Sequence, residues 1–158
     1  MSDWIALVIS LAAAFGAAAI GGAGTSKAIP VWYKGLKKPS FTPPEWAFGP
    51  VWTILYLLMA IAAWMVWEQG IAASVALPLA VYGIQLALNV LWSFLFFAWK
   101  KLRAGFIEII ALWAAVLATL LLFWGVSSIA GVLTVPYLAW VSVASALNYK
   151  VWKLNPAG

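Results

Sequence analysis

The sequence contains no histidine and no cysteine, and only four of its 158 residues are acidic. The bases and nucleophiles of Ser-His-Asp and Cys-His sites are therefore missing, which excludes both kinds of site. A transition-metal site would lack its usual ligands, and a haem iron would lack the usual His or Cys. No metal site is predicted. Any enzymatic activity would have to proceed without acid–base, nucleophilic or metal chemistry.

Charged residues are scarce, at 8% of the chain, whereas 66% of the residues are hydrophobic. The long uncharged runs cover residues 4–26, 46–67, 69–99 and 109–149. A helix needs about 20 apolar residues to cross a bilayer, so the last run is long enough for two spans, with a loop at 126–130. We predict an all-α integral membrane protein, a five-transmembrane-helix bundle that forms a single domain over residues 1–158. The predicted spans are residues 4–26, 46–67, 76–99, 104–124 and 132–152.

The nine basic residues all fall on one side of this predicted bundle. They lie between spans 1 and 2, between spans 3 and 4, and after span 5: Lys27, Lys34, Lys37, Lys38, Lys100, Lys101, Arg103, Lys150 and Lys153. The positive-inside rule predicts a cytoplasmic carboxyl terminus, cytoplasmic basic loops and an external amino terminus. Charges at the membrane edge indicate anionic lipid as a partner, and no basic cluster is large enough to bind nucleic acid.

The acidic residues are Asp3, Glu45, Glu68 and Glu108, and none of them falls near the middle of a span. Asp3 stands where a signal peptide would carry a basic residue, so we expect the first span to be retained. Glu108 is the one candidate for a proton relay. The alternative is structural: Glu108 lies about one turn from Arg103, where it can pair or extend toward the membrane edge.

The segment 27–45 is the longest polar stretch, and it is unusually aromatic for a solvated linker. It holds Trp32, Tyr33 and Phe41 among lysines and prolines. Thr42 and Glu45 fit a capping box with two prolines between them, so span 2 is predicted to begin sharply near residue 43. Two interpretations stand: an interfacial aromatic belt with basic anchors, or a lid over the bundle.

Span 3 has two distinct faces. Gln85, Asn89 and Trp92 lie within about 60° of one another on a 3.6-residue helix, which predicts one polar-aromatic face. Gly83 and Ala87 lie on the opposite face and form a small-xxx-small pattern, which is typical of close helix contacts. We interpret that face as a possible dimer interface. The structural alternative for the amides of Gln85 and Asn89 is a hydrogen bond to a neighbouring helix.

Spans 2 and 5 place aromatic residues at helical spacing. Trp52 and Tyr56 are four residues apart, and Trp140, Ala144 and Asn148 follow one another at intervals of four. Packing is the usual role of any single tryptophan within a span. Several indoles, a tyrosine and an amide together suit a planar aromatic ligand, on which the rings stack while the amide orients it.

Several of these motifs, in this order, resemble the TspO/MBR family, which includes the translocator proteins, the tryptophan-rich sensory proteins and the peripheral-type benzodiazepine receptor. The resemblance covers nearly the whole chain. It rests on Trp32-Tyr33, Lys38-Pro39, Pro43-Pro44, Phe48-Gly49-Pro50-Val51-Trp52-Thr53, Gln85-Leu86, Trp92-Ser93, Phe96-Phe97, Pro136-Tyr137-Leu138-Ala139-Trp140 and Leu147-Asn148-Tyr149.

The resemblance implies a five-helix bundle, usually a homodimer, with a cavity beneath the first loop. It also implies binding of porphyrins such as protoporphyrin IX and haem, of drug-like isoquinolines and benzodiazepines, and in some members of sterols such as cholesterol. No covalently held cofactor is implied, only a tetrapyrrole ligand. The family's pocket falls here on Tyr33, Trp52, Tyr56, Asn89, Trp92, Trp140 and Ala144.

Three functions follow as hypotheses. The first is a membrane receptor for tetrapyrroles that acts as a sensor, chaperone or exporter. The alternative is an enzyme that oxidises bound protoporphyrin in light, because in bacterial members light-driven degradation of protoporphyrin is tied to the tryptophans that match Trp52 and Trp140. Secondary transport by alternating access is disfavoured, since five helices leave no obvious inverted repeat. A sterol-type pattern is present at Leu147, Tyr149 and Lys153, but such motifs are weak. Phe41 stands where the family often has Trp, and the short carboxyl terminus suggests a bacterial cell membrane.

Overall fold

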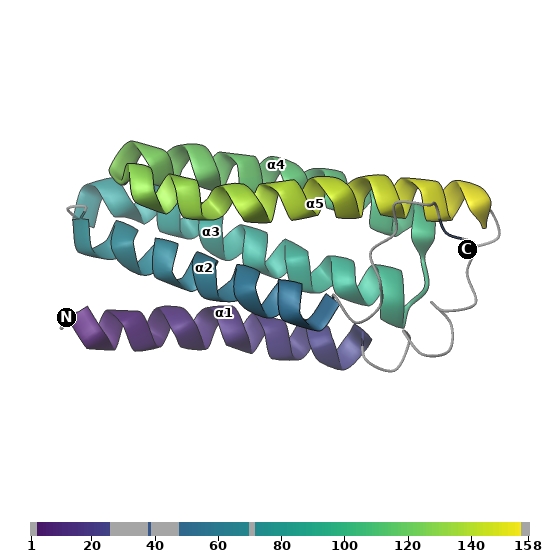
Figure 1. The fold of residues 1–158 in the computed structure, drawn as a ribbon, viewed down its shortest axis with the longest axis horizontal. Helices are drawn as coiled ribbons and strands as arrows, with labels where there is room; N and C mark the ends of the chain where they lie inside the picture. The colour runs from purple at the N-terminus through teal and green to yellow at the C-terminus, as the bar shows by residue number, and fades with distance from the viewer. Residues whose placement is uncertain (1–2, 26–37, 39–47, 70–71, 156–158) are drawn as a thin grey trace.

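A computed structural model describes residues 3–25, 38, 48–69 and 72–155, and within them every regular element is helical (Figure 1). The bundle contains five α-helices, and one π-helix follows the third. The elements are α1 (Asp3–Thr25), α2 (Phe48–Gln69), α3 (Ala72–Ser93), η3 (Phe94–Ala98), α4 (Leu102–Val126) and α5 (Ser128–Leu154).

Four of the helices contain stretches long and apolar enough to cross a membrane: Pro50–Glu68, Val75–Phe96, Leu102–Val126 and Ser128–Leu154. Helix α1 contributes a shorter apolar stretch, Trp4–Ile20. Large apolar side chains such as Leu77, Ile107 and Leu121 are exposed on the outside of the bundle. Outward-facing apolar side chains combined with internally satisfied helical backbones are what a lipid environment requires. The predicted all-α membrane bundle is therefore confirmed as an all-helical fold of membrane type.

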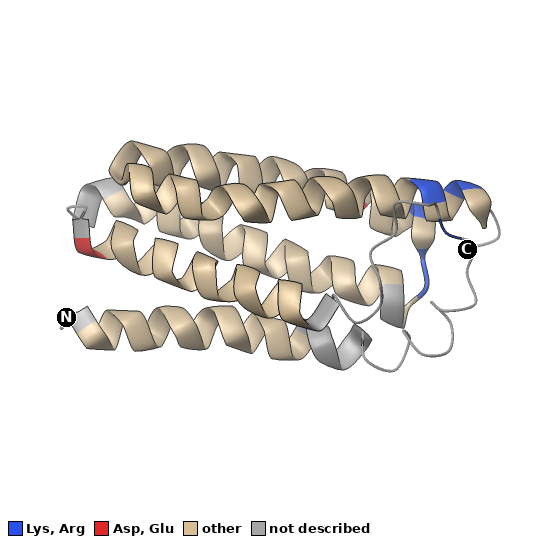
Figure 2. Ribbon diagram, viewed as in Figure 1, with Lys and Arg blue, Asp and Glu red and all other residues tan. Residues whose placement is uncertain are grey.

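The helices run along the long axis of the molecule. Helices α4 and α5 lie side by side on one face, α1 lies on the opposite face beside α2, and α3 runs through the middle (Figure 1). The described lysines and arginines gather at the end where α5 finishes, whereas α2, whose last residues are Glu68 and Gln69, finishes at the other end (Figure 2). The charge separation predicted from the sequence is therefore present in the described residues.

The connection between α4 and α5 differs from the predicted loop at 126–130. Only Ser127 separates the two helices, with an extended backbone at φ −149° and ψ 120°. Its hydroxyl accepts a hydrogen bond from the Ala130 amide at 3.3 Å and so caps α5. Gly125 and Gly131 do not break the chain but lie within helices, and the ring of Trp124 occupies the space where Gly131 would carry a side chain. A glycine inside a helix costs only about 1 kcal/mol, which such packing offsets.

The π-helix η3 was not predicted. It widens the last turn of span 3, and its Phe94 carbonyl accepts a hydrogen bond from the Trp99 amide at 2.7 Å. The chain then turns at Lys100, whose φ of 56° is left-handed, and α4 begins two residues later. The predicted start of span 2 near residue 43, with its capping box, lies outside the described residues. So does the lid-like segment 27–45, except for Lys38.

Pairing with Arg103, one of the two structural alternatives for Glu108, is wrong for the described part of the chain. Both oxygens of Glu108 are buried, and neither has a hydrogen-bond partner among the described residues. The two residues are five positions apart, which turns their side chains about 140° away from each other around α4. Side chains meet along a helix at spacings of three or four instead.

Candidate ligand site between helices α2, α3 and α5

Trp52, on α2, is the centre of an aromatic cluster that joins α2 to α5. Its ring centroid lies 6.0 Å from that of Trp140 and 6.3 Å from that of Tyr137, in both cases edge to face. Tyr56, one turn along α2, lies 5.9 Å from Trp52 at a tilted angle. Centroid separations of 4.5–7 Å with edge-on geometry are favourable for aromatic pairs. Four rings from two helices therefore form one wall in the interior of the bundle.

Helix α3 adds a polar group to this wall. The side-chain amide of Asn89 donates a hydrogen bond to the hydroxyl of Tyr137, and each of these side chains is only 1% exposed. A buried amide in lipid needs such a partner, because water cannot reach it. The bond fixes α3 against α5 and places the Asn89 amide next to the aromatic cluster.

One turn further along α3, Trp92 makes a second network. Its indole N–H donates to the Asn148 side-chain oxygen at 2.9 Å, and the Asn148 nitrogen donates to the Leu102 carbonyl at 2.8 Å. Gly105 makes this approach possible, because a Cβ at this position would lie 3.0 Å from the Asn148 oxygen. The Trp92 ring also stacks on Phe96 at 5.3 Å. Three helices, α3, α4 and α5, meet at Asn148.

Ala144 lies between the two groups, one turn from Trp140 and one turn from Asn148, and it is buried. The two networks therefore form one stripe along the inner side of α5, with a small residue in the middle. The stripe is closed. Tyr56, Asn89, Trp92 and Ala144 are all buried, and the rings pack on one another. The indoles of Trp52 and Trp140 are half-buried, at the edge of the stripe between α2 and α5.

One turn before Asn89 on α3, the core contains polar side chains whose hydrogen-bonding groups are not all used. Gln85 is buried, and its amide nitrogen points at the sulfur of Met59 at 3.6 Å. The Gln85 oxygen and the Tyr82 hydroxyl are buried without a hydrogen-bond partner among the described residues. Gln85, Asn89 and Trp92 thus share one buried face of α3, as their spacing predicted.

Comparisons with known proteins decide the family. The model of the TspO/MBR family matches residues 7–153. The tryptophan-rich sensory protein of Cereibacter sphaeroides is 40% identical over 154 residues, which cover 97% of this chain and 93% of that protein. The tryptophan-rich protein TspO of Archaeoglobus fulgidus is 44% identical over 140 residues, covering 87% of this chain and 90% of that protein. The human translocator protein is 39% identical over 126 residues, which cover 78% of this chain and 75% of that protein.

The chain belongs to the TspO/MBR family. The predicted resemblance is thereby confirmed, and with the apolar helices it makes this chain a multi-pass integral membrane protein. Six of the seven pocket residues predicted from TspO/MBR membership lie along the stripe described above. The seventh, Tyr33, lies outside the described residues. The stripe brings Trp52, Tyr56 and Trp140 into one cluster with Asn89, and separates them by about one helical turn from Trp92.

Three residues that build the stripe, Tyr137, Leu102 and Gly105, were not predicted as site residues from the sequence. Tyr137 was quoted only within a motif, yet it is the residue through which Asn89 reaches the cluster. Its place three residues before Trp140 on one helix was an available signal. Leu102 contributes only its carbonyl, and Gly105 contributes only the absence of a side chain. Neither of those roles has a sequence signature, because both depend on how close α4 approaches Asn148.

The other predicted positions of this TspO/MBR chain lie outside the stripe. Gly83 and Ala87 are exposed on the outer face of α3, and nothing lies within 4 Å of a Cβ built on Gly83. In the sterol-type pattern, Leu147 is 3% exposed and faces the core, whereas Tyr149 is 38% exposed and Lys153 is also exposed. The three residues do not share one surface. Among the described residues there is no cluster of acidic side chains that could hold a metal ion.

Proposed function

We propose that this protein binds planar tetrapyrroles, with protoporphyrin IX and haem as the ligands, and drug-like hydrophobic molecules, and that it acts in porphyrin transport, sensing or regulation. One observation carries the proposal: Trp52 lies in edge contact with both Trp140 and Tyr137, beside Tyr56. A flat conjugated ring gains stacking energy from indoles and phenols that no aliphatic side chain supplies. The Asn89 amide, next to the same cluster, supplies an orienting polar group.

The charge distribution supports an acidic planar ligand. The carboxylates of a porphyrin are anionic, and the described lysines and arginines lie at the end of the bundle where α5 finishes. A porphyrin whose ring enters between α2 and α5 can direct its carboxylates toward that end. The apolar ring then replaces the contacts that Trp52 and Trp140 make with each other in the closed state.

The first test is a dark titration of purified protein with protoporphyrin IX, following tryptophan fluorescence. Saturation near one porphyrin per chain is expected. Ala144→Phe fills the middle of the stripe and should abolish saturable quenching. Ala139→Phe places the same ring on an exposed position of α5 and should leave it unchanged. Non-saturating quenching in the unmodified protein, or equal loss in both variants, contradicts the proposal.

A second candidate function is light-dependent oxidation of the bound porphyrin by oxygen. The 6.0 Å separation of the Trp52 and Trp140 rings favours it, because two adjacent indoles can share an oxidised state next to the ligand. Illumination with protoporphyrin IX should give a new product that disappears in Trp140→Phe. Trp4→Phe, on an exposed position of α1, is the control. Unchanged product in Trp140→Phe, with binding retained, removes this role.

We further propose five membrane spans, with α1 as the first, in the cell membrane and with the basic end in the cytoplasm. The positive-inside rule supports this orientation. Because the chain has no cysteine, single cysteines report accessibility without background. A membrane-impermeant maleimide added to intact cells should label Ser128→Cys and should not label Lys150→Cys. The reverse labelling pattern means an inverted topology. Labelling of both cysteines contradicts the proposed topology, in which the two positions lie on opposite sides of the membrane.

A homodimer through the outer face of α3 is proposed on the exposed Gly83 and Ala87, which let two helices approach closely. Gly83→Leu should shift the detergent-solubilised protein from dimer to monomer. Ala139→Leu, on the exposed side of α5, is the matched control. A dimer that survives Gly83→Leu has another interface.

A further inference from the structure

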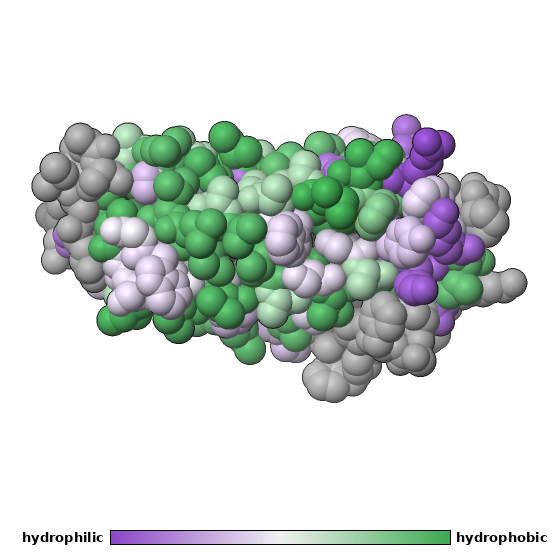
Figure 3. Space-filling view, turned by 90° about the horizontal axis from the view of Figure 1, so that it is seen from above, coloured by the Kyte–Doolittle hydropathy of each residue, from purple (hydrophilic) through white to green (hydrophobic). Residues whose placement is uncertain are grey.

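One end of the α4–α5 face combines cations, aromatic rings and exposed apolar side chains. On α4, Arg103, Phe106, Ile107 and Ile110 follow the spacing that places residues on one side of a helix. Ile107 is 61% exposed, and Arg103 and Ile110 are exposed as well. Figure 3 shows this face from outside, with hydrophobic residues along its length and hydrophilic residues gathered at one end.

Three rings connect α4 and α5 at this end. Phe106, on α4, lies 5.2 Å from Tyr149 and 6.0 Å from Trp152, and the last two lie 6.2 Å apart. They form a platform that crosses from one helix to the other. An aromatic platform at the end of membrane helices lies at the depth of the lipid headgroups.

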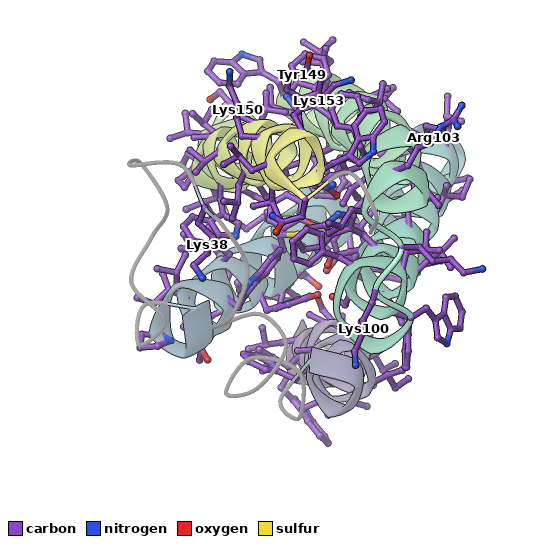
Figure 4. All side chains as sticks on the ribbon, turned by 90° about the vertical axis from the view of Figure 1, so that its right-hand side faces the viewer. Lys38, Lys100, Arg103, Tyr149, Lys150 and Lys153 are labelled. Atoms are coloured by element: carbon purple, nitrogen blue, oxygen red, sulfur yellow. The ribbon has the colours of Figure 1, made fainter. Side chains whose placement is uncertain are left out.

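Two ammonium groups lie over this platform. The Lys153 Nζ is 4.2 Å from the centroid of Trp152 and 5.6 Å from that of Tyr149, and the Lys150 Nζ is 6.0 Å from that of Tyr149. Cation–π contact at these distances holds a lysine in place without neutralising its charge. In Figure 4, Lys153 lies between Lys150, on the outer side of α5, and Arg103, on α4, whereas Lys100 lies on the other side, toward α1.

None of Arg103, Lys150 and Lys153 forms an ion pair with an acidic side chain among the described residues. Both oxygens of Glu108, the nearest acid along α4, are buried and have no hydrogen-bond partner among the described residues. Three cations on one side of one membrane edge therefore have no protein counter-charge in the described part of the chain. An anionic lipid headgroup supplies that charge at the required depth.

We propose that this edge of the bundle, where Lys153 lies between Arg103 and Lys150, binds the headgroup of an anionic phospholipid. Its acyl chain lies along Ile107 and Ile110. From Arg103 to Ile110 the helix rises by about 10 Å, so the stripe leads from the headgroup region into the hydrocarbon. A sterol fits the site less well, because one hydroxyl group leaves three cations without an anion. Leu147 of the sterol-type pattern faces the core instead of this surface. This site lies on the lipid-facing surface and does not depend on the proposed porphyrin function.

The test compares two double variants that each remove two charges from this end: Arg103→Gln/Lys153→Gln, inside the site, and Lys100→Gln/Lys101→Gln, outside it. Native mass spectrometry of the full chain in detergent measures retained phosphatidylglycerol against phosphatidylcholine at increasing lipid concentration. Each basic contact with an anionic headgroup contributes about fivefold, so the site variant should bind phosphatidylglycerol about 25-fold more weakly. The outside variant should change this by less than about threefold.

Three results overturn the proposal. Equal weakening in the two variants means that general charge attraction, and no built site, holds the lipid. Equal retention of phosphatidylcholine by the unmodified protein means that the headgroup charge is not recognised. Full displacement of the lipid by millimolar inorganic phosphate means a site for free anions. The unfolding temperature of both variants without added lipid should match that of the unmodified protein, since all four side chains are exposed.

Discussion

The indole N–H of Trp92 donates to the side-chain oxygen of Asn148 at 2.9 Å, and this bond joins α3 to α5 across the start of α4. It exists because α4 carries Gly105 at the point of closest approach. Asn148 completes the junction by donating to the Leu102 carbonyl at 2.8 Å. The amide of Asn148 and the absence of a side chain at Gly105 therefore position α3, α4 and α5 at the Trp92 end of the candidate site.

Gly105→Ala is expected to destabilise the protein by about 1–2 kcal/mol. The added methyl group would press on the Asn148 oxygen, and this strain exceeds the gain in helix propensity. The measurement is reversible unfolding in detergent. Gly125→Ala, on the same helix, is the control, because nothing lies within 4 Å of its Cβ. That variant should be unchanged or more stable by up to about 1 kcal/mol. If the two variants behave alike, the close approach at Gly105 has no energetic importance.

Tyr137→Phe is expected to cost about 1–3 kcal/mol, because it leaves the buried Asn89 amide without its acceptor. Ring packing against Trp52 is retained, so the loss reports the hydroxyl alone. Tyr149→Phe removes an exposed hydroxyl from the same helix and should change stability by less than about 0.5 kcal/mol. An unchanged Tyr137→Phe variant would show that Asn89 finds another partner.

Ser127→Ala is expected to cost about 1 kcal/mol of stability, since the hydroxyl caps α5 at a one-residue break between two membrane helices. Ser128→Ala is the matched control at the neighbouring, exposed position. The measurement is the shift of the unfolding midpoint in detergent for each variant relative to the unmodified protein. A larger effect at position 128 would place the cap one residue later than described.

Glu108→Gln is expected to leave stability unchanged or to raise it by about 1 kcal/mol. The carboxylate oxygens are buried without a partner among the described residues, and an amide of the same shape has a smaller desolvation cost. Thermal unfolding at neutral pH measures this. Destabilisation by more than about 1 kcal/mol would reveal a partner that the carboxylate acquires in the membrane.

Much of the fold follows from local pattern. The apolar runs locate all five helices, because a span is determined by the length and polarity of a continuous segment. Where described, the helix ends differ from prediction by up to four residues when η3 is counted with α3. Helical periodicity places Gln85, Asn89 and Trp92 on a buried face and Gly83 and Ala87 on an exposed one. The family motifs add which tryptophans belong to one site.

The exceptions are positions where residues far apart in the chain decide the outcome. Glycines and serines near residue 127 predict a loop, yet packing of Trp124 against Gly131 keeps both helices intact up to Ser127. The π-helix η3 depends on how the chain turns into α4, and its apolar sequence is compatible with an ordinary helix.

The sequence by itself determined the class of the protein, its helical segments, the separation of charge between its two ends and the inner faces of spans 2, 3 and 5, since all of these depend on neighbours along the chain. Only the tertiary structure decided that Tyr137 joins Asn89 to the aromatic cluster, that Gly105 admits Asn148, and that the stripe is closed. Those features depend on distances between helices, which side-chain volumes at many positions set together.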